Sequence, residues 1–399
     1  MVGTQGRERT GRVSYTRTPL LIAFREAVGL RDTYGGIDGV VALQAHHLKP
    51  DAPSDTIVIF MHPMGIMHYL PLPGALADAG IHVLTAVSRY PNNDSALIME
   101  KVAVDLGRWV AHAREVLGYS KVVLAGWSGG GSLALFYQAE AADPQITHTP
   151  AGEAFPMAEA KLPPVDGIML LAAHVSRAQT LTEWLDASVS DEAGPVRDPK
   201  WNLYSPEAPQ PPYSSDFLAD YAARQVARSN RITAWAQATL AELKAREGPH
   251  AERAFIVHGT MAAPCWLDGQ VDPNDRQPGR CYLGDPRLIN DSPGGLGRFT
   301  TLRSWLSQWS LKSNACSLKV GHRIRVPVLV VGNTADDACT PSHTQRLFDC
   351  VVNAPSRELQ LVHGATHYYA FQPDHLKRAA GIVTDWLARY GFQPALPPS

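Results

Sequence analysis

The stretch KVVLAGWSGG, residues 121–130, joins an apolar run to a serine flanked by glycines. Its first half is typical of a buried strand, and the segment from about Gly131 to Ala142 has helical character. A serine between glycines at a strand-to-helix junction is lifted out of a sheet as an exposed nucleophile. Gly126 and Gly130 supply the small residues that let strand and helix approach each other. We therefore predict a nucleophile turn with Ser128 at its tip.

Short apolar runs alternate with helical patterns on both sides of this turn. We expect strands at Val40–His46, Thr56–His62, His82–Val87, Lys121–Gly126, Val165–Ala172, Val326–Gly332 and Leu359–Val362. We expect helices at about Ser95–Leu117, His343–Val352 and Asp374–Tyr390. Continuous apolar strands separated by helices indicate a parallel sheet that is covered on both faces. The predicted fold class is therefore α/β, with a mostly parallel, doubly wound sheet.

The alternation stops between about Ser176 and Arg325, where proline-rich loops, a helix at Ser214–Arg246 and a tryptophan-bearing helix at Arg303–Trp309 are expected. This position, between the sixth and seventh sheet strands, is where a cap can be inserted over an active site without disturbing the sheet. We predict a core domain of residues 1–175 and 326–399, and a large, mainly helical cap at 176–325. An independent domain is the alternative, but no long flexible linker marks either boundary.

Composition narrows the range of partners. The 399 residues carry a formal net charge of −2 and no basic cluster, which predicts neither nucleic acid nor an anionic membrane as partner. A small, largely neutral substrate is the expectation that remains. Residues 1–18 are polar, and no run of about 18 apolar residues occurs, which predicts a soluble, cytoplasmic protein. The sequence does not indicate the oligomeric state.

The five cysteines are irregularly spaced and include no C-x-x-C pair, so we expect reduced thiols rather than a metal or redox site. The histidines at 46, 47 and 68 are not at metal-ligand spacing either. No cofactor and no metal are predicted.

A serine hydroxyl is a poor nucleophile at neutral pH, so Ser128 needs a base and a carboxylate that orients the base. The stretch NTADDACTP, residues 333–341, follows a predicted strand and supplies acidic side chains at its carboxyl end. Catalytic groups gather at that edge of open α/β sheets. The stretch HGATH, residues 363–367, follows the last strand. The order serine, acid, histidine along the chain is the one expected of this architecture.

The three motifs together make the sequence similar to the α/β-hydrolase superfamily over about residues 36–172 and 325–392. That family carries its acid on the loop after the seventh strand, commonly about four residues before a proline, and its histidine at the end of a G-x-x-H stretch. The resemblance implies Asp337 as the acid and His367 as the base. Asp336 is the alternative acid if the turn is one residue tighter, and His363 is the alternative base.

The oxyanion of an acyl-transfer intermediate requires two N–H donors aimed at one point. We expect the first from the backbone of Gly129, the residue after the nucleophile. In the family the second comes from a loop after the third strand, which reads HPMG at residues 62–65 here. Since proline has no N–H, the resemblance implies the backbone of Met64 as the second donor.

The resemblance implies a cap-bearing serine hydrolase that cleaves a carboxylic ester or lactone through an acyl-enzyme. The same triad also serves amide, thioester and carbon–carbon bond hydrolysis and acyl transfer, which the motif does not separate. A catalytically silent ligand-binding protein is the alternative from another class, because a fold alone does not establish activity.

Overall fold

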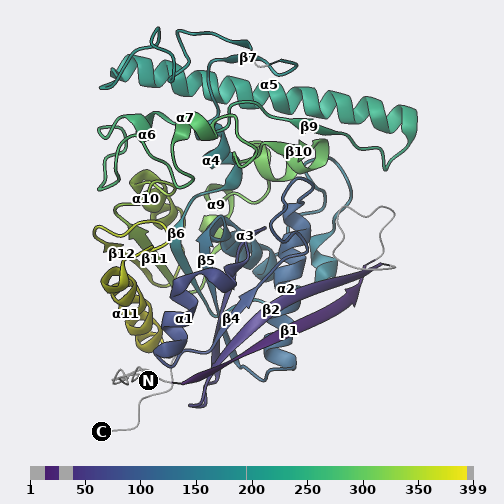
Figure 1. The fold of residues 1–399 in the computed structure, drawn as a ribbon. Coiled ribbons are helices and arrows are strands. Elements are labelled where there is room, and N and C mark those ends of the chain that lie inside the picture. Colours follow the sequence, from purple (N-terminus) through teal and green to yellow (C-terminus); the bar gives the residue numbers. More distant parts are fainter. Residues whose placement is uncertain (1–13, 27–38, 195, 393–399) are drawn as a thin grey trace, which may run out of the picture.

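The structure is a computed structural model that describes residues 14–26, 39–194 and 196–392, so most of the polar N-terminal stretch lies outside the described residues. Its centre is an eight-stranded sheet with the strand order β1-β2-β4-β3-β5-β6-β11-β12 (Figure 1). The strands are β1 (Tyr15–Arg25), β2 (Val40–Pro50), β3 (Thr56–Met61), β4 (Val83–Ala86), β5 (Lys121–Ser128), β6 (Gly167–Ala173), β11 (Val328–Asn333) and β12 (Arg357–Val362). Strand β2 pairs antiparallel with β1 and β4, and the remaining neighbours are parallel. The predicted α/β class with a mostly parallel sheet is confirmed.

Seven of these strands were predicted, whereas β1 was not. Strands β3 and β6 are buried along their whole length, which is why they read as continuous apolar runs. Strand β1 lies at the edge of the sheet, where its residues alternate between exposed and half-buried. An edge strand with one solvated face carries polar residues and gives a weaker signal.

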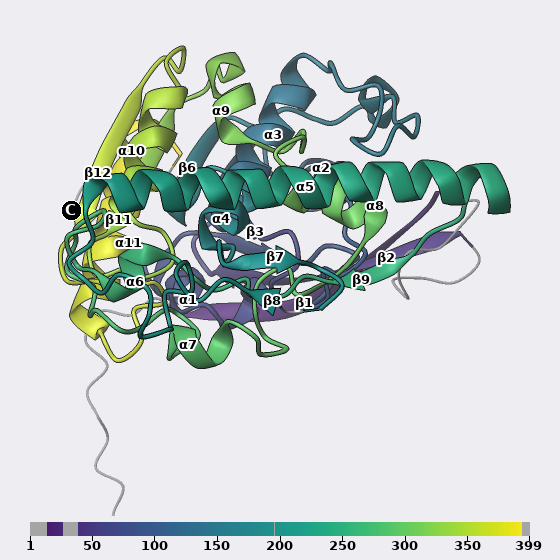
Figure 2. The same ribbon diagram turned by 90° about the horizontal axis from the view of Figure 1, so that it is seen from above.

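Helices cover both faces of the sheet (Figure 2). The core helices are α1 (Pro71–Asp78), α2 (Met99–Glu115), α3 (Gly130–Ala142), α10 (Pro341–Cys350) and α11 (Pro373–Arg389), with short 3-10 turns η1 (Met67–Tyr69) and η2 (Met157–Ala160). Helices α2, α3 and α10 share one buried apolar cluster, and α1 and α11 share the cluster on the opposite face. Among the described residues, no helix is long and apolar enough to cross a membrane.

The chain between β6 and β11 forms a separate set of elements, which we call the cap segment (residues 176–325). It contains α4 (Arg177–Trp184), β7 (Val189–Asp191), β8 (Val196–Arg197), α5 (Ser215–Glu247), β9 (Ala254–Ile256), α6 (Pro264–Leu267), α7 (Pro286–Ile289), β10 (Phe299–Thr301), α8 (Leu302–Ser304), the π-helix η3 (Trp305–Trp309), α9 (Ser317–Val320) and the 3-10 turn η4 (Gly321–Arg323). The predicted long helix is confirmed as α5, which crosses the top of the molecule in Figure 1. The hydroxyl of Ser214 caps its first turn by accepting from the backbone N–H of Phe217.

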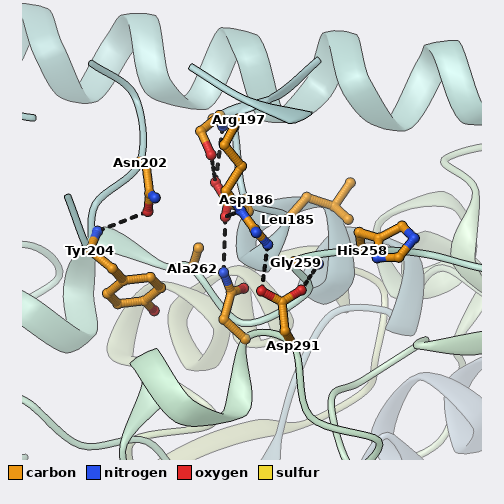
Figure 3. A network of polar contacts seen from close by, with 12 residues as sticks. Leu185, Asp186, Arg197, Asn202, Tyr204, His258, Gly259, Ala262 and Asp291 are labelled. Carbon is orange, nitrogen blue, oxygen red and sulfur yellow. Dashed lines mark hydrogen bonds and ion pairs between the residues drawn. The ribbon is translucent and has the colours of Figure 1, made fainter. Parts of the chain in front are cut away.

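A buried carboxylate ties three parts of the cap segment together (Figure 3). Asp186 has no exposed side-chain surface, and its Oδ2 accepts from Arg197 Nε and from Asn290 Nδ2, each at 2.9 Å. Arg197 Nη2 also donates to Asp291 Oδ2 at 2.6 Å, and Asp291 Oδ1 accepts from the backbone N–H of Gly259 at 3.2 Å. The network therefore joins Asp186, in the loop after α4, to Arg197 of β8, to residues 290–291 after α7 and, through Asp291, to Gly259 after β9.

We expect Asp186→Asn to lower the free energy of unfolding by about 3 kcal/mol, because it removes one charge from a buried pair and turns an amide N–H₂ toward existing donors. Urea denaturation followed by circular dichroism measures the change. Asp291→Asn is the matched control, since Asp291 pairs with the same guanidinium but its side chain is 46 % exposed. We expect that control to lose less than about 1 kcal/mol. Equal losses in the two variants would contradict the assignment of the buried carboxylate as the anchor.

Candidate active site

Ser128 ends strand β5 in a strained backbone conformation. Its φ is 52°, in the left-handed region that is costly for a residue with a side chain. A Cβ at Gly126 would lie 2.4 Å from the Gly130 carbonyl oxygen, and one at Gly130 would lie 2.4 Å from the Met61 carbonyl oxygen. Contacts this short are not tolerated, so both glycines are required for strand and helix to approach. Helix α3 begins at Gly130, which places the predicted turn at the predicted junction.

The loops after β11 and β12 bring an acid and a histidine together. The backbone N–H of Ala335 donates to the carbonyl of Ala365 at 2.9 Å, which joins the two loops. His367 Nδ1 and Asp336 Oδ2 are 2.7 Å apart, and both side chains are buried. Asp336 Oδ1 accepts from the backbone N–H groups of Ala338 and Cys339, at 2.7 and 2.8 Å. The carboxylate is therefore held in one orientation while it binds the imidazole.

The expectation that Asp337 contacts the histidine is wrong, and the alternative Asp336 takes that position. The backbone N–H of Asp336 donates to the carbonyl of Asn333, so the turn is the tighter one. Asp337 instead contributes its backbone carbonyl, which accepts from Trp266 Nε1 at 2.6 Å. Burial, followed by the nearby charge of Asp336, raises the pKa of the Asp337 carboxyl. The rival histidine, His363, is exposed to solvent.

Ser128 and His367 line one cavity of about 590 Å³, between the carboxyl edge of the sheet and the cap segment. The ring of Trp127, the residue before the serine, lies edge-on to the His367 imidazole with centroids 5.7 Å apart. Cys339 lies beside the imidazole, with its Sγ within 4.8 Å of a ring nitrogen of His367. The structure thus places the Ser128 hydroxyl in the same cavity as an imidazole that is bound to a buried carboxylate.

Asp336, Cys339 and His367 also form a group with the donor atoms of a metal site, the one such group within the described parts of the chain. Burial, and then the charge of Asp336, raises the pKa of the Cys339 thiol well above its usual range. A metal needs the thiolate and free carboxylate oxygens, whereas here the raised pKa favours the thiol, and the two oxygens of Asp336 already accept from His367 Nδ1 and from two backbone N–H groups. These contacts make the group poorly suited to hold a metal.

The predicted oxyanion loop, residues 62–65, is present beside the turn, but its backbone is arranged differently from the expectation. The N–H groups of Met64 and Gly65 donate to His62 Nδ1, at 3.2 and 2.8 Å. The Met64 N–H is therefore already bound within its own loop, which contradicts its predicted role as an oxyanion donor. Gly129, the other predicted donor, is buried at the start of α3, where backbone N–H groups are not used by the helix.

Three side chains of the cavity were not singled out from the sequence. His62 and His174 both approach Gly129, since a Cβ placed there would lie 2.8 Å from His62 Nε2 and 3.5 Å from His174 Nε2. Arg177, at the start of α4, lines the same cavity with its side chain buried. His174 and Arg177 lie within four residues of the carboxyl end of β6. Their place after a strand end was the one feature of the sequence that could have indicated them as site residues.

No protein-family model and no curated protein matches this sequence. Similar solved structures include Est1E from Butyrivibrio proteoclasticus, at 14 % identity and a TM-score of 0.46, covering 90 % of this chain and 99 % of that one. The monoacylglycerol lipase of Paleococcus ferrophilus has 15 % identity and a TM-score of 0.42, covering 87 % of this chain and 99 % of that one. A brefeldin A esterase, described as a bacterial homologue of human hormone-sensitive lipase, has 15 % identity and a TM-score of 0.44, covering 98 % of this chain and 79 % of that one.

Proposed function

We propose that this chain, which has the α/β-hydrolase fold, is a serine hydrolase that cleaves a carboxylic ester or lactone of a small, largely neutral substrate through an acyl-enzyme. The observation that carries the proposal is the strained Ser128 in one cavity with a histidine that a buried carboxylate holds. A hydrogen-bonded base and a carboxylate that orients the base are what activates a serine hydroxyl.

In the first half of the reaction, Ser128 Oγ attacks the ester carbonyl while His367 Nε2 accepts the hydroxyl proton. Asp336 accepts a hydrogen bond from Nδ1, so the proton-accepting lone pair is on Nε2, and its negative charge stabilises the imidazolium. The tetrahedral intermediate collapses with cleavage of the bond to the leaving oxygen, which takes the proton from His367. An alcohol leaves and an acyl group remains on Ser128.

In the second half, His367 accepts a proton from water as the water oxygen attacks the acyl carbonyl. The second tetrahedral intermediate collapses, Ser128 Oγ regains the proton, and the carboxylic acid product leaves. The net reaction consumes one ester and one water and yields one acid and one alcohol, with the enzyme unchanged.

The cavity supports a substrate without net charge. Arg177 is its buried cation, and the guanidinium pairs with Asp94 through Nη2 and donates to Gln308 Oε1 at 2.9 Å through Nε. The charges of Arg177 and Asp94 compensate each other inside the cavity, and Arg298, the other arginine of its lining, pairs with Asp291 at 3.3 Å. A volume of about 590 Å³ is within the range of small-molecule sites. We further propose that residues 176–325 act as a cap, since the start of α4 and residues 293–299 line the same cavity as Ser128.

Labelling with a fluorophosphonate, detected by intact-protein mass spectrometry, tests the proposal. The wild-type protein should gain one covalent adduct at Ser128, and Ser128→Ala should gain none. A wild-type protein that does not react would favour the silent ligand-binding alternative. Rates of hydrolysis of a panel of activated esters, lactones, amides and thioesters then distinguish the proposed ester hydrolysis from other reactions that use the same triad.

Hydrolysis should be lost as the pH falls, because only a neutral His367 accepts the serine proton. Burial holds the pKa of His62 and of His174 well below the usual range, so these two imidazoles stay neutral where ordinary histidines become charged. We therefore do not expect His62 or His174 to produce the acidic limb of the pH–rate profile. His367→Ala should abolish turnover at every pH, whereas a variant of the exposed rival, His363→Ala, should keep the wild-type profile. The reverse pattern would move the base to His363.

A further inference from the structure

We propose that the side chain of His62 supplies the second oxyanion donor, through an Nε2–H group beside the backbone N–H of Gly129. The inference rests on the proposed serine hydrolase function. It replaces the Met64 backbone, whose N–H is already bound, by a neutral imidazole from the same loop.

The tautomer of His62 follows from its hydrogen bonds. Nδ1 lies 2.8 Å from the backbone nitrogen of Gly65 and 3.2 Å from that of Met64, and both groups are donors. Nδ1 must therefore be the unprotonated acceptor. In a neutral imidazole the proton is then on Nε2, which becomes a donor. The loop backbone thus selects the tautomer as well as the orientation of the ring.

The position of Nε2 places that donor at the nucleophile turn. A Cβ built on Gly129 would lie 2.8 Å from Nε2 and 3.4 Å from Cδ2 of His62. The Nε2 edge of the ring is therefore packed against the residue that provides the first donor. His62, Ser128 and His367 line the same cavity, so an acyl oxygen bound near Gly129 would be within reach of the imidazole.

Neutrality suits this role. Burial, and then the charges of Arg177 and His367, keep the pKa of His62 well below its usual range. A second proton would also have to displace the two backbone donors from Nδ1. When Ser128 Oγ attacks, the carbonyl oxygen gains negative charge, and a preorganised donor then binds it more strongly than it binds the ester. His62 would accordingly contribute to kcat more than to KM.

His174 is the competing imidazole at this turn. Its Nε2 would be 3.5 Å from a Cβ on Gly129, farther than that of His62. Its Nδ1 is buried with no hydrogen-bond partner among the residues described, so nothing selects its tautomer. His174→Asn is therefore a matched comparison, because it makes the same substitution in the second imidazole near Gly129.

Two substitutions separate the two ring nitrogens of His62. Asparagine places an oxygen near the Nδ1 position and can still accept from the loop, but it lacks the Nε2 donor. Glutamine reaches the Nε2 position and can donate there. We expect H62N to lower kcat by about 10²- to 10³-fold, with KM changed less than about fivefold. H62Q should recover at least about tenfold over H62N, and H174N should lose less kcat than H62N.

Affinity for a trifluoromethyl ketone, whose hemiketal with Ser128 carries an oxyanion, gives an independent measurement. It should weaken in H62N in parallel with kcat/KM, because both depend on the same donor. If H62N does not fold, as judged by its unfolding midpoint, H62Q is compared with H62A in the same assays. Tenfold or more activity in H62Q, roughly the value expected of a retained donor, supports the proposal, and equal activity overturns it.

A folded H62N with wild-type kcat and wild-type ketone affinity would overturn the role of His62. A loss confined to KM, or a greater loss in H174N, would also overturn it. Ser128→Ala is measured alongside to keep the two proposals apart. If Ser128→Ala is inactive and H62N is fully active, only the second donor is misassigned. If Ser128→Ala keeps its turnover, the serine mechanism itself is wrong.

Discussion

Ser128→Ala is expected to lower kcat by about 10³-fold or more while the protein remains folded. The hydroxyl is the group that would form the acyl-enzyme, and it lies in the same cavity as His367, which is bound to Asp336. Alanine keeps the Cβ, so the backbone strain at φ 52° is unchanged and the unfolding midpoint should be close to that of the wild type. Steady-state hydrolysis of an activated ester and thermal unfolding measure the two effects.

Ser132→Ala is the matched control for this prediction. Ser132 is one turn into α3, and its hydroxyl donates to the Gly129 carbonyl at 3.2 Å. We expect that variant to keep kcat within about tenfold of the wild type, since it removes a local hydrogen bond and not a nucleophile. More than about a tenth of wild-type activity in a folded Ser128→Ala protein would contradict the proposed nucleophile.

Asp336→Asn is expected to lower kcat by about 10⁴-fold, the scale known for this change in a serine protease triad. Asp336 Oδ1 accepts two backbone N–H groups, so the asparagine oxygen would stay there and its N–H₂ would turn toward His367 Nδ1. That contact requires an unprotonated Nδ1. The imidazole proton then moves to Nε2, which can no longer accept from Ser128.

The neighbouring Asp337→Asn makes the same chemical change one residue away. Asp337 acts through its backbone carbonyl, which accepts from Trp266 and is not altered by the substitution. We expect kcat within about fivefold of the wild type. Rate measurements on both variants, with unfolding midpoints as the check on folding, decide the assignment. The reverse ranking would return the role to Asp337.

Much of the fold follows from local patterns in the sequence. The apolar runs of β3, β5 and β6 mark strands because these strands are buried on both faces, and α5 was predicted to within a residue at each end. Strand β1 exposes both polar Thr16–Thr18 and apolar Leu21 and Ala23, so it has neither a continuous apolar run nor a regular alternation by which it could be found.

The sequence identified the loops that form the site, but it did not identify which residue of each loop contributes the functional group. Asp336 and Asp337 are adjacent acids, and the choice between them depends on the hydrogen bond between Ala335 and Ala365, residues 30 positions apart. The position of the His62 ring beside Gly129 depends likewise on how the loop of His62 packs against the turn after β5. Such long-range contacts leave no mark in the local sequence.

The left-handed backbone of Ser128 sets stability and catalysis against each other at a single position. The left-handed conformation raises the free energy of a residue with a side chain by on the order of 1 kcal/mol, whereas it raises that of glycine by almost nothing. Glycine at 128 would therefore relieve this strain, but it would remove the proposed nucleophile. At this position, the backbone strain therefore opposes the requirement of the proposed chemistry for a side-chain hydroxyl.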